Sequence, residues 1–250
     1  MSRWLAVPAL LLLALPFITL ICVTPWHGFH LAYGDWDSVA TSLGLSGISI
    51  PLIILLGTPL ALWLARTASP MRHWMEIMVL IPLLTPPLAL GILLVSVYGP
   101  YGALGSVIGR IGISVTNNAG AFVIAQIYGA LPYYVISART AFEAVPTAVE
   151  DAAKVLGAPP WQILFRLTLP LARQGLATGL AIAWVRVIGE FGIVLVFSYF
   201  PQGIPVKLYI NLQNDGIDAV YSLLWLLLVV TLPFPLWCLA SARRSQKRRA

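Results

Sequence analysis

Long apolar runs separated by short polar stretches make up most of the chain. Six of these runs are long enough to cross the hydrocarbon core of a membrane as helices, which takes about 20 residues each. They lie near residues 4–24, 43–65, 74–98, 119–138, 176–199 and 221–242. No polar stretch is long enough to build a water-soluble core. The pattern therefore predicts an all-α, polytopic integral membrane protein with six transmembrane helices in a single domain over residues 1–250.

Two of the runs carry signals beyond their length. The first follows Arg3 and so resembles a signal peptide, but it is longer than the usual apolar region of one and no A-x-A cleavage site follows it. We expect it to be retained as a helix. The third contains Pro82, Pro86 and Pro87, which remove backbone donors. We expect this helix to be bent inside a bundle, where neighbouring helices satisfy the freed carbonyls.

Composition and charge support the membrane assignment and predict an orientation. The chain is 59% hydrophobic and 10% charged, whereas a soluble domain has about 25% charged residues. With six helices, both termini lie on the same side of the membrane, and the basic residues divide unequally between the two sides. The other side holds Arg110 and Lys207, whereas the side of the termini holds Arg3, Arg66, Arg72, Arg139, Lys154, Arg166, Arg173, Arg243, Arg244, Lys247, Arg248 and Arg249. By the positive-inside rule, both termini and the loop 139–175 are expected on the cytoplasmic face of a bacterial inner membrane.

The net charge of +6 therefore indicates topology, and we do not expect binding to nucleic acid. The basic C-terminal tail, RRSQKRR, is typical of a cytoplasmic cluster next to the anionic headgroups of the lipid bilayer. His27 and His30 lie near Asp35 and Asp37, but a third well-placed ligand is missing. No metal site is expected.

The loop 139–175 contains the longest polar and amphipathic stretch of the chain. Thr147 and Glu150 have the spacing of a capping box, in which each side chain bonds the backbone amide of the other, so a helix is expected to begin there. Gly157 can adopt the left-handed conformation that ends a helix. The pattern predicts a short helix between these positions.

A second short helix is expected to begin at Pro159 and Pro160, because proline is tolerated in the first turn, and to end at Pro170. One face of this helix would hold Trp161, Leu164, Phe165 and Thr168. Such a face can pack on the membrane domain or lie in the headgroup layer. It can also dock into a groove of a cytoplasmic partner. Periodicity alone leaves both interpretations open.

The stretch DAAKVLGAPPWQILFRLTLP resembles the EAA loop of binding-protein-dependent ABC importer permeases. That motif has Glu-Ala-Ala, three residues, Gly, nine residues and Ile-x-Leu-Pro. The matching positions are Asp151, Ala152, Ala153, Gly157, Leu167, Leu169 and Pro170. Asp151 replaces the glutamate and Leu167 the isoleucine, and both replacements keep the chemistry.

The resemblance implies that the second helix is a coupling helix, between membrane helices four and five, that seats in a cleft of a separate ATPase subunit. The coupling residues would be Glu150, Asp151, Ala152, Ala153, Gly157, Pro160, Trp161, Leu164, Phe165, Leu169 and Pro170. It also implies a second permease copy, as a homodimer, two cytoplasmic ATPase subunits and an external substrate-binding protein.

Enzyme activity is not expected of this chain. It contains no G-x-x-x-x-G-K-[ST] phosphate loop, so ATP and Mg would be bound by the partner subunit and the chain itself would need no cofactor. No catalytic nucleophile, acid and base can be nominated. The alternatives are a secondary carrier or channel that works without an ATPase and, less favoured, a membrane enzyme.

Arg186 and Glu190 lie four residues apart inside the fifth apolar run, within reach of each other on one helix face. A charge in mid-membrane is costly, so both are expected to face the bundle and to pair. They either hold helices together or line the translocation pathway, where Arg186 would attract anions.

Three segments resemble the molybdate and sulfate permeases within this family. RVIGEFG is similar to their Arg-Ala-Leu-Gly-Glu-Phe-Gly segment, GPYGALG to a glycine-rich outer loop, and IPVKLYINLQ to a Leu-Pro-x-x-Ile-Tyr segment, from which Lys207 departs. The resemblance implies that the cargo is a tetrahedral oxyanion such as molybdate, tungstate or sulfate. Phosphonate, thiamine or ferric iron are the alternatives.

Overall fold

The computed structural model describes the backbone of residues 7–247 and the side chains of these residues except 239 and 242–247. Arg3 and the basic residues from Arg243 onward, which contributed to the predicted orientation, lie outside the described side chains. The described residues form helices and no strand. This confirms the all-α prediction.

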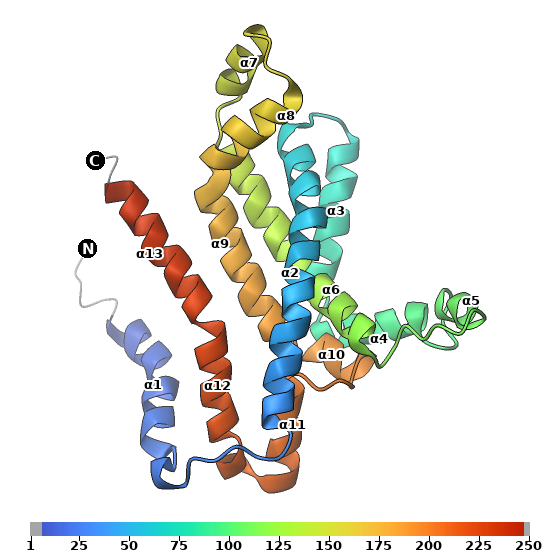
Figure 1. Cartoon of the computed structure of the whole chain (residues 1–250), viewed down its shortest axis with the longest axis vertical. Helices are drawn as coiled ribbons and strands as arrows, with labels where there is room; N and C mark the ends of the chain where they lie inside the picture. The colour runs from blue at the N-terminus through green and yellow to red at the C-terminus, as the bar shows by residue number, and fades with distance from the viewer. Residues whose placement is uncertain (1–6, 248–250) are drawn as a thin grey trace.

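The helices follow one another along the chain as a set of long rods and short connectors (Figure 1). They are α1 (Val7–Val23), α2 (Asp35–Arg66), α3 (Met71–Leu84), α4 (Pro87–Tyr98), α5 (Gly105–Gly109), α6 (Ala119–Glu143), α7 (Thr147–Val155), α8 (Pro160–Ile163), α9 (Leu169–Ile188), α10 (Gly192–Phe197), α11 (Ile204–Asp215), α12 (Tyr221–Thr231) and α13 (Pro233–Lys247). A π-helical turn, η3 (Leu164–Thr168), joins α8 to α9.

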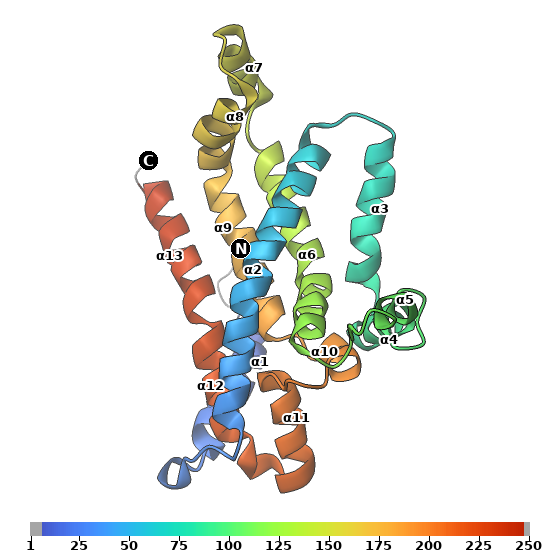
Figure 2. The same cartoon turned by 45° about the vertical axis from the view of Figure 1, so that its right-hand side comes forward.

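The centre of the molecule is the packing of α2, α6 and α9, which lie side by side in Figures 1 and 2. Ile53 and Leu64 of α2 and Phe142 of α6 are almost fully buried there. Glycines allow close approach, because a Cβ at Gly175 of α9 would collide with Ala141 of α6. Small residues at helix contacts are the usual means of packing helices within lipid.

The third apolar run is bent far more sharply than a kinked helix. The predicted helix 74–98 is two helices, α3 and α4, at an angle of 111°. Thr85 has ψ 128° and Pro86 has ψ 136°, both extended, because a residue that precedes proline is driven away from the helical region. Leu90 and Leu94 of α4 then pack on the short helix α10. The predicted bend is confirmed, but it divides the run 74–98 into two separate helices, where a single bent helix was expected.

The fifth run also differs from its prediction of 176–199. Helix α9 begins earlier, at Leu169, and ends at Ile188, so that α10 is a separate helix. By length and apolar character, three helices among the described residues can cross a membrane, or four if the bent pair counts as one span. These are α2, α6 and the stretch 217–238, with α3 and α4 as the bent pair. The total of six spans stays a prediction.

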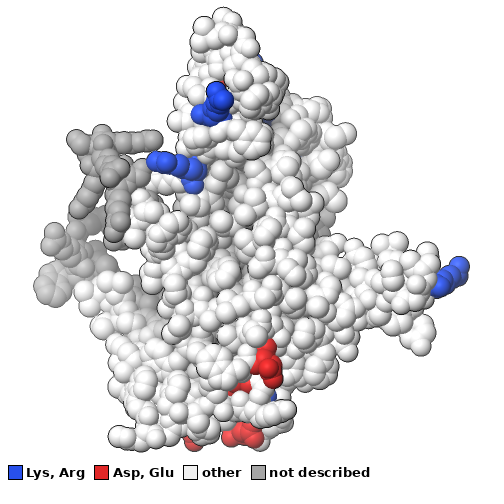
Figure 3. All heavy atoms as spheres, in the orientation of Figure 1, with Lys and Arg blue, Asp and Glu red and all other residues white. Residues whose placement is uncertain are grey.

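Charged side chains are distributed unevenly between the two ends of the molecule, although the loop end also carries carboxylates such as Glu143, Glu150 and Asp151. On the face drawn in Figure 3, Lys and Arg lie over the end that carries α7, α8 and the start of α9 and at the tip of the α5 segment, and Asp and Glu lie over the opposite end. The acidic end contains Asp35 and Asp37 in the first turn of α2 and Asp215 at the end of α11. The predicted sidedness, in which the basic end faces the cytoplasm, stays a prediction.

Candidate functional site

The loop between α6 and α9 projects from the basic end of the bundle (Figures 1 and 2). Helix α7 starts at Thr147, after the extended Pro146, and ends at Val155. Gly157 follows with φ +81°, a conformation that costs glycine little and other residues more. The predicted helix and its glycine stop are confirmed.

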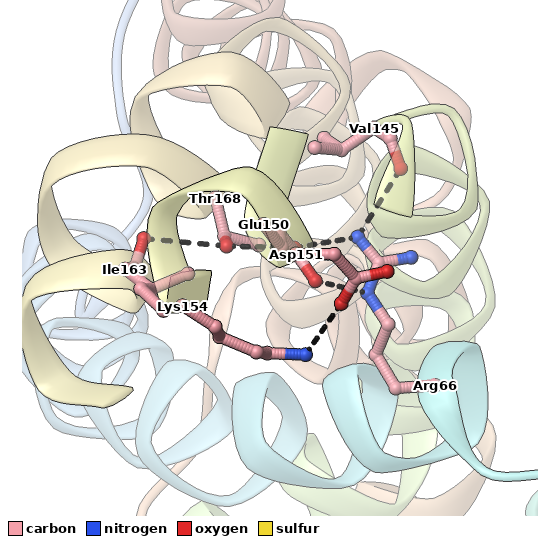
Figure 4. Close-up of polar contacts among 7 residues, drawn as sticks. All are labelled: Arg66, Val145, Glu150, Asp151, Lys154, Ile163 and Thr168. Atoms are coloured by element: carbon pink, nitrogen blue, oxygen red, sulfur yellow. Dashed lines mark hydrogen bonds and ion pairs between the residues drawn. The ribbon is translucent and has the colours of Figure 1, made fainter. Parts of the chain in front are cut away.

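The predicted capping box does not form. No side chain caps the start of α7, and Thr147 is itself its first residue. The carboxylate of Glu150 instead turns toward Arg66, the last residue of α2 (Figure 4). Arg66 donates from Nε to Oε2 at 3.0 Å and from Nη2 to Oε1 at 2.8 Å. Two parallel charge-assisted hydrogen bonds from Arg66 stabilise the carboxylate more than the single hydrogen bond from a backbone amide that a capping box would provide.

Two further contacts complete this cluster. Thr168 of η3 donates its hydroxyl to Glu150 Oε1 at 2.8 Å, and Arg66 Nη2 donates to the carbonyl of Val145 at 3.2 Å. Burial by itself raises the pKa of Glu150, but the hydrogen bonds from Arg66 and Thr168 overcome this and hold the pKa below its usual value. Glu150 is therefore ionised at neutral pH.

The second loop helix is continuous with α9, so the prediction that Pro170 ends it is wrong. The amide of Leu169 donates to the carbonyl of Leu164, five residues back. This wider π-helical turn takes up one extra residue and places Pro170 in the first turn of α9, where a missing amide donor is tolerated. The loop helix and α9 therefore form one bent rod.

The predicted apolar face divides between the interior and the surface. Thr168 is buried, whereas Trp161 and Phe165 are 57% and 63% exposed. Ile163, which was not predicted to be on this face, is buried. Phe165 also lines a groove of about 660 Å³ with Leu164, Leu169 and residues of α2, α6 and α9.

The other predicted coupling residues lie mostly on the surface. Asp151, Ala152, Gly157, Pro160 and Pro170 are exposed, and Ala153 is half-buried. Asp151 bonds Lys154 at 2.8 Å, with both side chains more than 60% exposed. Of the predicted set, Glu150 alone is buried. Its partners Arg66 and Thr168 were missed, because neither is its neighbour in sequence.

Arg186 and Glu190 pair as predicted, with Nη2 and Oε2 3.1 Å apart. The Glu190 side chain is 1% exposed, and its Oε1 accepts from the amide of Ile193 at the start of α10. The Arg186 guanidinium lies 5.0 Å from the ring centroid of Tyr133 and donates from Nε to the carbonyl of Gly129 at 3.4 Å.

Arg186 also borders open space. Its side chain is 32% exposed and lines a cavity of about 300 Å³ with residues of α9 and α13. The Arg186–Glu190 pair thus connects α9, α6 and α10, and the Arg186 side chain also borders the cavity. That Arg186 and Glu190 line a translocation pathway stays a prediction.

Two of the four residues considered for a metal make other contacts. Asp35 is buried and accepts from Asn211 at 2.9 Å and from the amide of Ala32 at 2.8 Å. His30 bonds the carbonyl of Gly28. Within residues 7–238, whose side chains are described, no three His, Cys, Asp or Glu residues cluster as metal ligands.

Known proteins with similar sequences are permeases. The chain is 34% identical over 241 residues to the molybdenum transport system permease protein ModB of Mycobacterium tuberculosis, covering 92% of this chain and 90% of that protein. It is 35% identical over 184 residues to a probable molybdenum ABC transporter permease protein of Haloferax volcanii, covering 74% and 67%.

Solved structures share the fold at lower sequence identity. A chain of a bacterial alginate ABC transporter has a TM-score of 0.76 at 21% identity and covers 98% of this chain and 96% of its own. A chain of the MetNI methionine ABC transporter has a TM-score of 0.65 at 18% identity, covering 83% and 94%.

The family model for the binding-protein-dependent transport system inner membrane component matches residues 57–245, which include the loop and the Arg186–Glu190 pair. The chain therefore belongs to this family of inner membrane transport components.

Proposed function

We propose that this chain is the permease subunit of an ABC importer that moves a tetrahedral oxyanion, molybdate in the first place, into the cell. Family membership supports the transport role, and the molybdenum transport for which two relatives are named supports the cargo. Six spans, cytoplasmic termini, a homodimer, two ATPase subunits and an external binding protein complete the proposal. ATP and Mg would be bound by the ATPase.

One observation carries the proposed mechanism. Trp161 and Phe165 are exposed on a segment that continues without interruption into α9. Large exposed aromatic side chains are typical anchors at protein interfaces. In the proposal they seat in the ATPase, and closure of the ATPase displaces α8 and η3. Because α9 continues η3, the displacement reaches Arg186, near the far end of α9.

The role of Arg186 in the proposal follows from its surroundings. A guanidinium that borders a cavity attracts an anion, and the buried Glu190 fixes its position and offsets its charge. The offset prevents Arg186 from trapping the cargo. Alternating access then requires that the cavity open to one side of the membrane at a time.

The docking step is tested by changing Trp161→Ala together with Phe165→Ala and measuring co-purification with the partner ATPase. We expect the retained ATPase to fall at least about tenfold, since removal of two aromatic anchors costs more than 1.4 kcal/mol. Trp36→Ala with Phe29→Ala removes two exposed aromatic side chains near the opposite end and serves as the control. Equal ATPase retention in both variants would refute docking through this pair.

The cargo is tested by uptake into proteoliposomes that contain the whole complex and its binding protein. Molybdate uptake should require ATP and should fall in Arg186→Gln while assembly is unchanged. Uptake without any ATPase would instead indicate a secondary carrier. A binding protein that takes phosphonate, thiamine or ferric iron and leaves molybdate unbound would replace the cargo.

A further inference from the structure

We infer that Arg66, Glu150 and Thr168 form a joint that locks the first loop helix to α2 and to η3, so that the loop moves as a rigid body when the ATPase displaces it. Glu150 is then a positioning residue that acts inside this chain and does not contact the ATPase. This inference rests on the proposed function.

The joint connects segments that are far apart in the sequence. The two oxygens of Glu150 accept three hydrogen bonds, two from Arg66 at the end of α2 and one from Thr168 in η3. Arg66 also bonds the carbonyl of Val145, in the turn between α6 and α7. Figure 4 shows the contacts of Arg66 and Thr168 meeting at the carboxylate of Glu150, with the carbonyl of Val145 bonded to Arg66. Both loop helices are thereby tied to α2.

Helix α7 has little else to hold it in place. Glu150 is its one buried residue, whereas Val149 is 39% exposed and Val155 is 87% exposed. An amphipathic helix usually gains its place through an apolar face, but here the buried group is a carboxylate. The attachment of α7 therefore depends on the charge and the geometry of the joint.

Thr168 extends the joint into the π-helical turn. Its hydroxyl lies 2.8 Å from Glu150 Oε1 and 3.3 Å from the carbonyl of Ile163. A π-helical turn is an uncommon geometry that needs support from its surroundings. With Thr168 bonded to Glu150, a push on α8 moves α7, η3 and α9 together and is not absorbed by bending at η3.

The neighbouring carboxylate has a different environment. Asp151 and its partner Lys154 are 63% and 62% exposed, respectively. Asp151 therefore remains available to a partner protein, whereas Glu150 is directed into its own chain. Adjacent acidic residues in the loop thus divide the two tasks, contact with the partner and support of the loop.

The test uses the full complex, with its ATPase subunits and binding protein, in proteoliposomes. Glu150→Gln and Thr168→Val are compared with Thr168→Ser, which keeps the hydroxyl. Glu143→Gln is the matched control, because its carboxylate also pairs with arginine, Arg72 at 3.0 Å and Arg139 at 2.8 Å, but it belongs to α6 and not to α7 or η3. ATPase association, ATP hydrolysis and molybdate uptake are measured for each.

In Glu150→Gln we expect ATPase association within about twofold of wild type and uptake per ATP lowered about tenfold, the scale of a typical coupling between sites. Thr168→Val should shift uptake per ATP in the same direction, and Thr168→Ser and Glu143→Gln should stay within about twofold. Thr168→Val keeps the ion pair, so it remains informative if Glu150→Gln does not fold.

Two results would overturn the inference. Unchanged uptake per ATP in Glu150→Gln and in Thr168→Val would show that the joint does not serve coupling. Loss of ATPase association in folded Glu150→Gln would show that Glu150 contacts the ATPase. Failure of the wild-type chain to bind any ATPase is a separate outcome, which would refute the proposed function itself.

Discussion

Gly129 is the position at which the smallest substitution should have a large and traceable effect. A Cβ added to Gly129 would lie 2.5 Å from Oε2 and 3.0 Å from Cδ of Glu190. The carboxylate would have to move, but Arg186 and the amide of Ile193 hold it and its side chain is 1% exposed. Gly129→Ala should therefore displace Glu190 and break its bond to Arg186.

The magnitude follows from three contributions to the free energy of unfolding. Overpacking of a filled interior costs about 1–3 kcal/mol. Loss of a hydrogen bond to a charged group costs about 1.5–3 kcal/mol. Alanine in place of glycine within a helix returns about 0.5–1 kcal/mol. The net destabilisation should be about 2–4 kcal/mol, since the first two contributions overlap.

The assay is thermal unfolding of the purified chain in detergent. For a chain of this length, about 2 kcal/mol corresponds to a fall of about 4–8 °C in Tm. Gly47→Ala is the matched control, because Gly47 also lies inside a helix but its added Cβ would meet nothing within 4 Å. That variant should keep or slightly raise Tm.

A Gly129→Ala variant that is as stable as Gly47→Ala would refute the reasoning. The collision can also be tested by adding Glu190→Ala, which removes the atoms that the new Cβ meets. The added effect of Gly129→Ala should then be much smaller than in the wild-type background. Equal effects in both backgrounds would show that the cost comes from elsewhere.

Three further predictions concern stability. The pKa of Glu150 is held below its ordinary value of 4.5, so the ionised carboxylate stabilises the folded state above about pH 4.5, and this stabilisation is lost as the pH falls through the folded-state pKa. Tm of wild type should therefore drop more steeply between pH 6 and pH 3 than Tm of Glu150→Gln. Parallel curves would contradict this. Gly157→Ala should cost about 1 kcal/mol through its positive φ alone, since its Cβ meets nothing within 4 Å, and Gly157→Asn should cost less; the order is read from Tm. Gln126→Leu removes the buried acceptor of Ser49 and the buried donor to Ser46 and should cost about 1–3 kcal/mol, measured the same way. An unchanged Tm would show that the two serines find other hydrogen-bond partners.

Local signals in the sequence predicted local structure well. The apolar runs 43–65 and 119–138 fall within α2 and α6, because hydrophobicity and length suffice to identify a long helix. Gly157 ends its helix as expected, since the choice of a left-handed residue depends on its own backbone. Arg186 and Glu190 pair because four residues bring them to one helix face.

Features that depend on distant residues were not predictable in this way. The prolines predicted a bend near Pro86, but the angle of 111° also reflects the docking of α4 (Pro87–Tyr98) on α10 (Gly192–Phe197), which is distant in the chain. Thr147 and Glu150 have the spacing of a capping box, yet the carboxylate of Glu150 bonds the guanidinium of Arg66, which lies 84 residues away in the sequence. No pattern within the loop itself identifies Arg66 as the partner.

The π-helical turn of η3 determines the direction in which the exposed Trp161 points around the helix axis. Each residue of an α-helix advances about 100° around the axis, and η3 contains one residue more than an α-helical turn would. If the same residues of η3 formed an ordinary α-helical turn, the extra residue would no longer be taken up within that turn. Trp161, which precedes η3, would then be rotated by about 100° around the axis of α9, away from a cleft shaped to receive it.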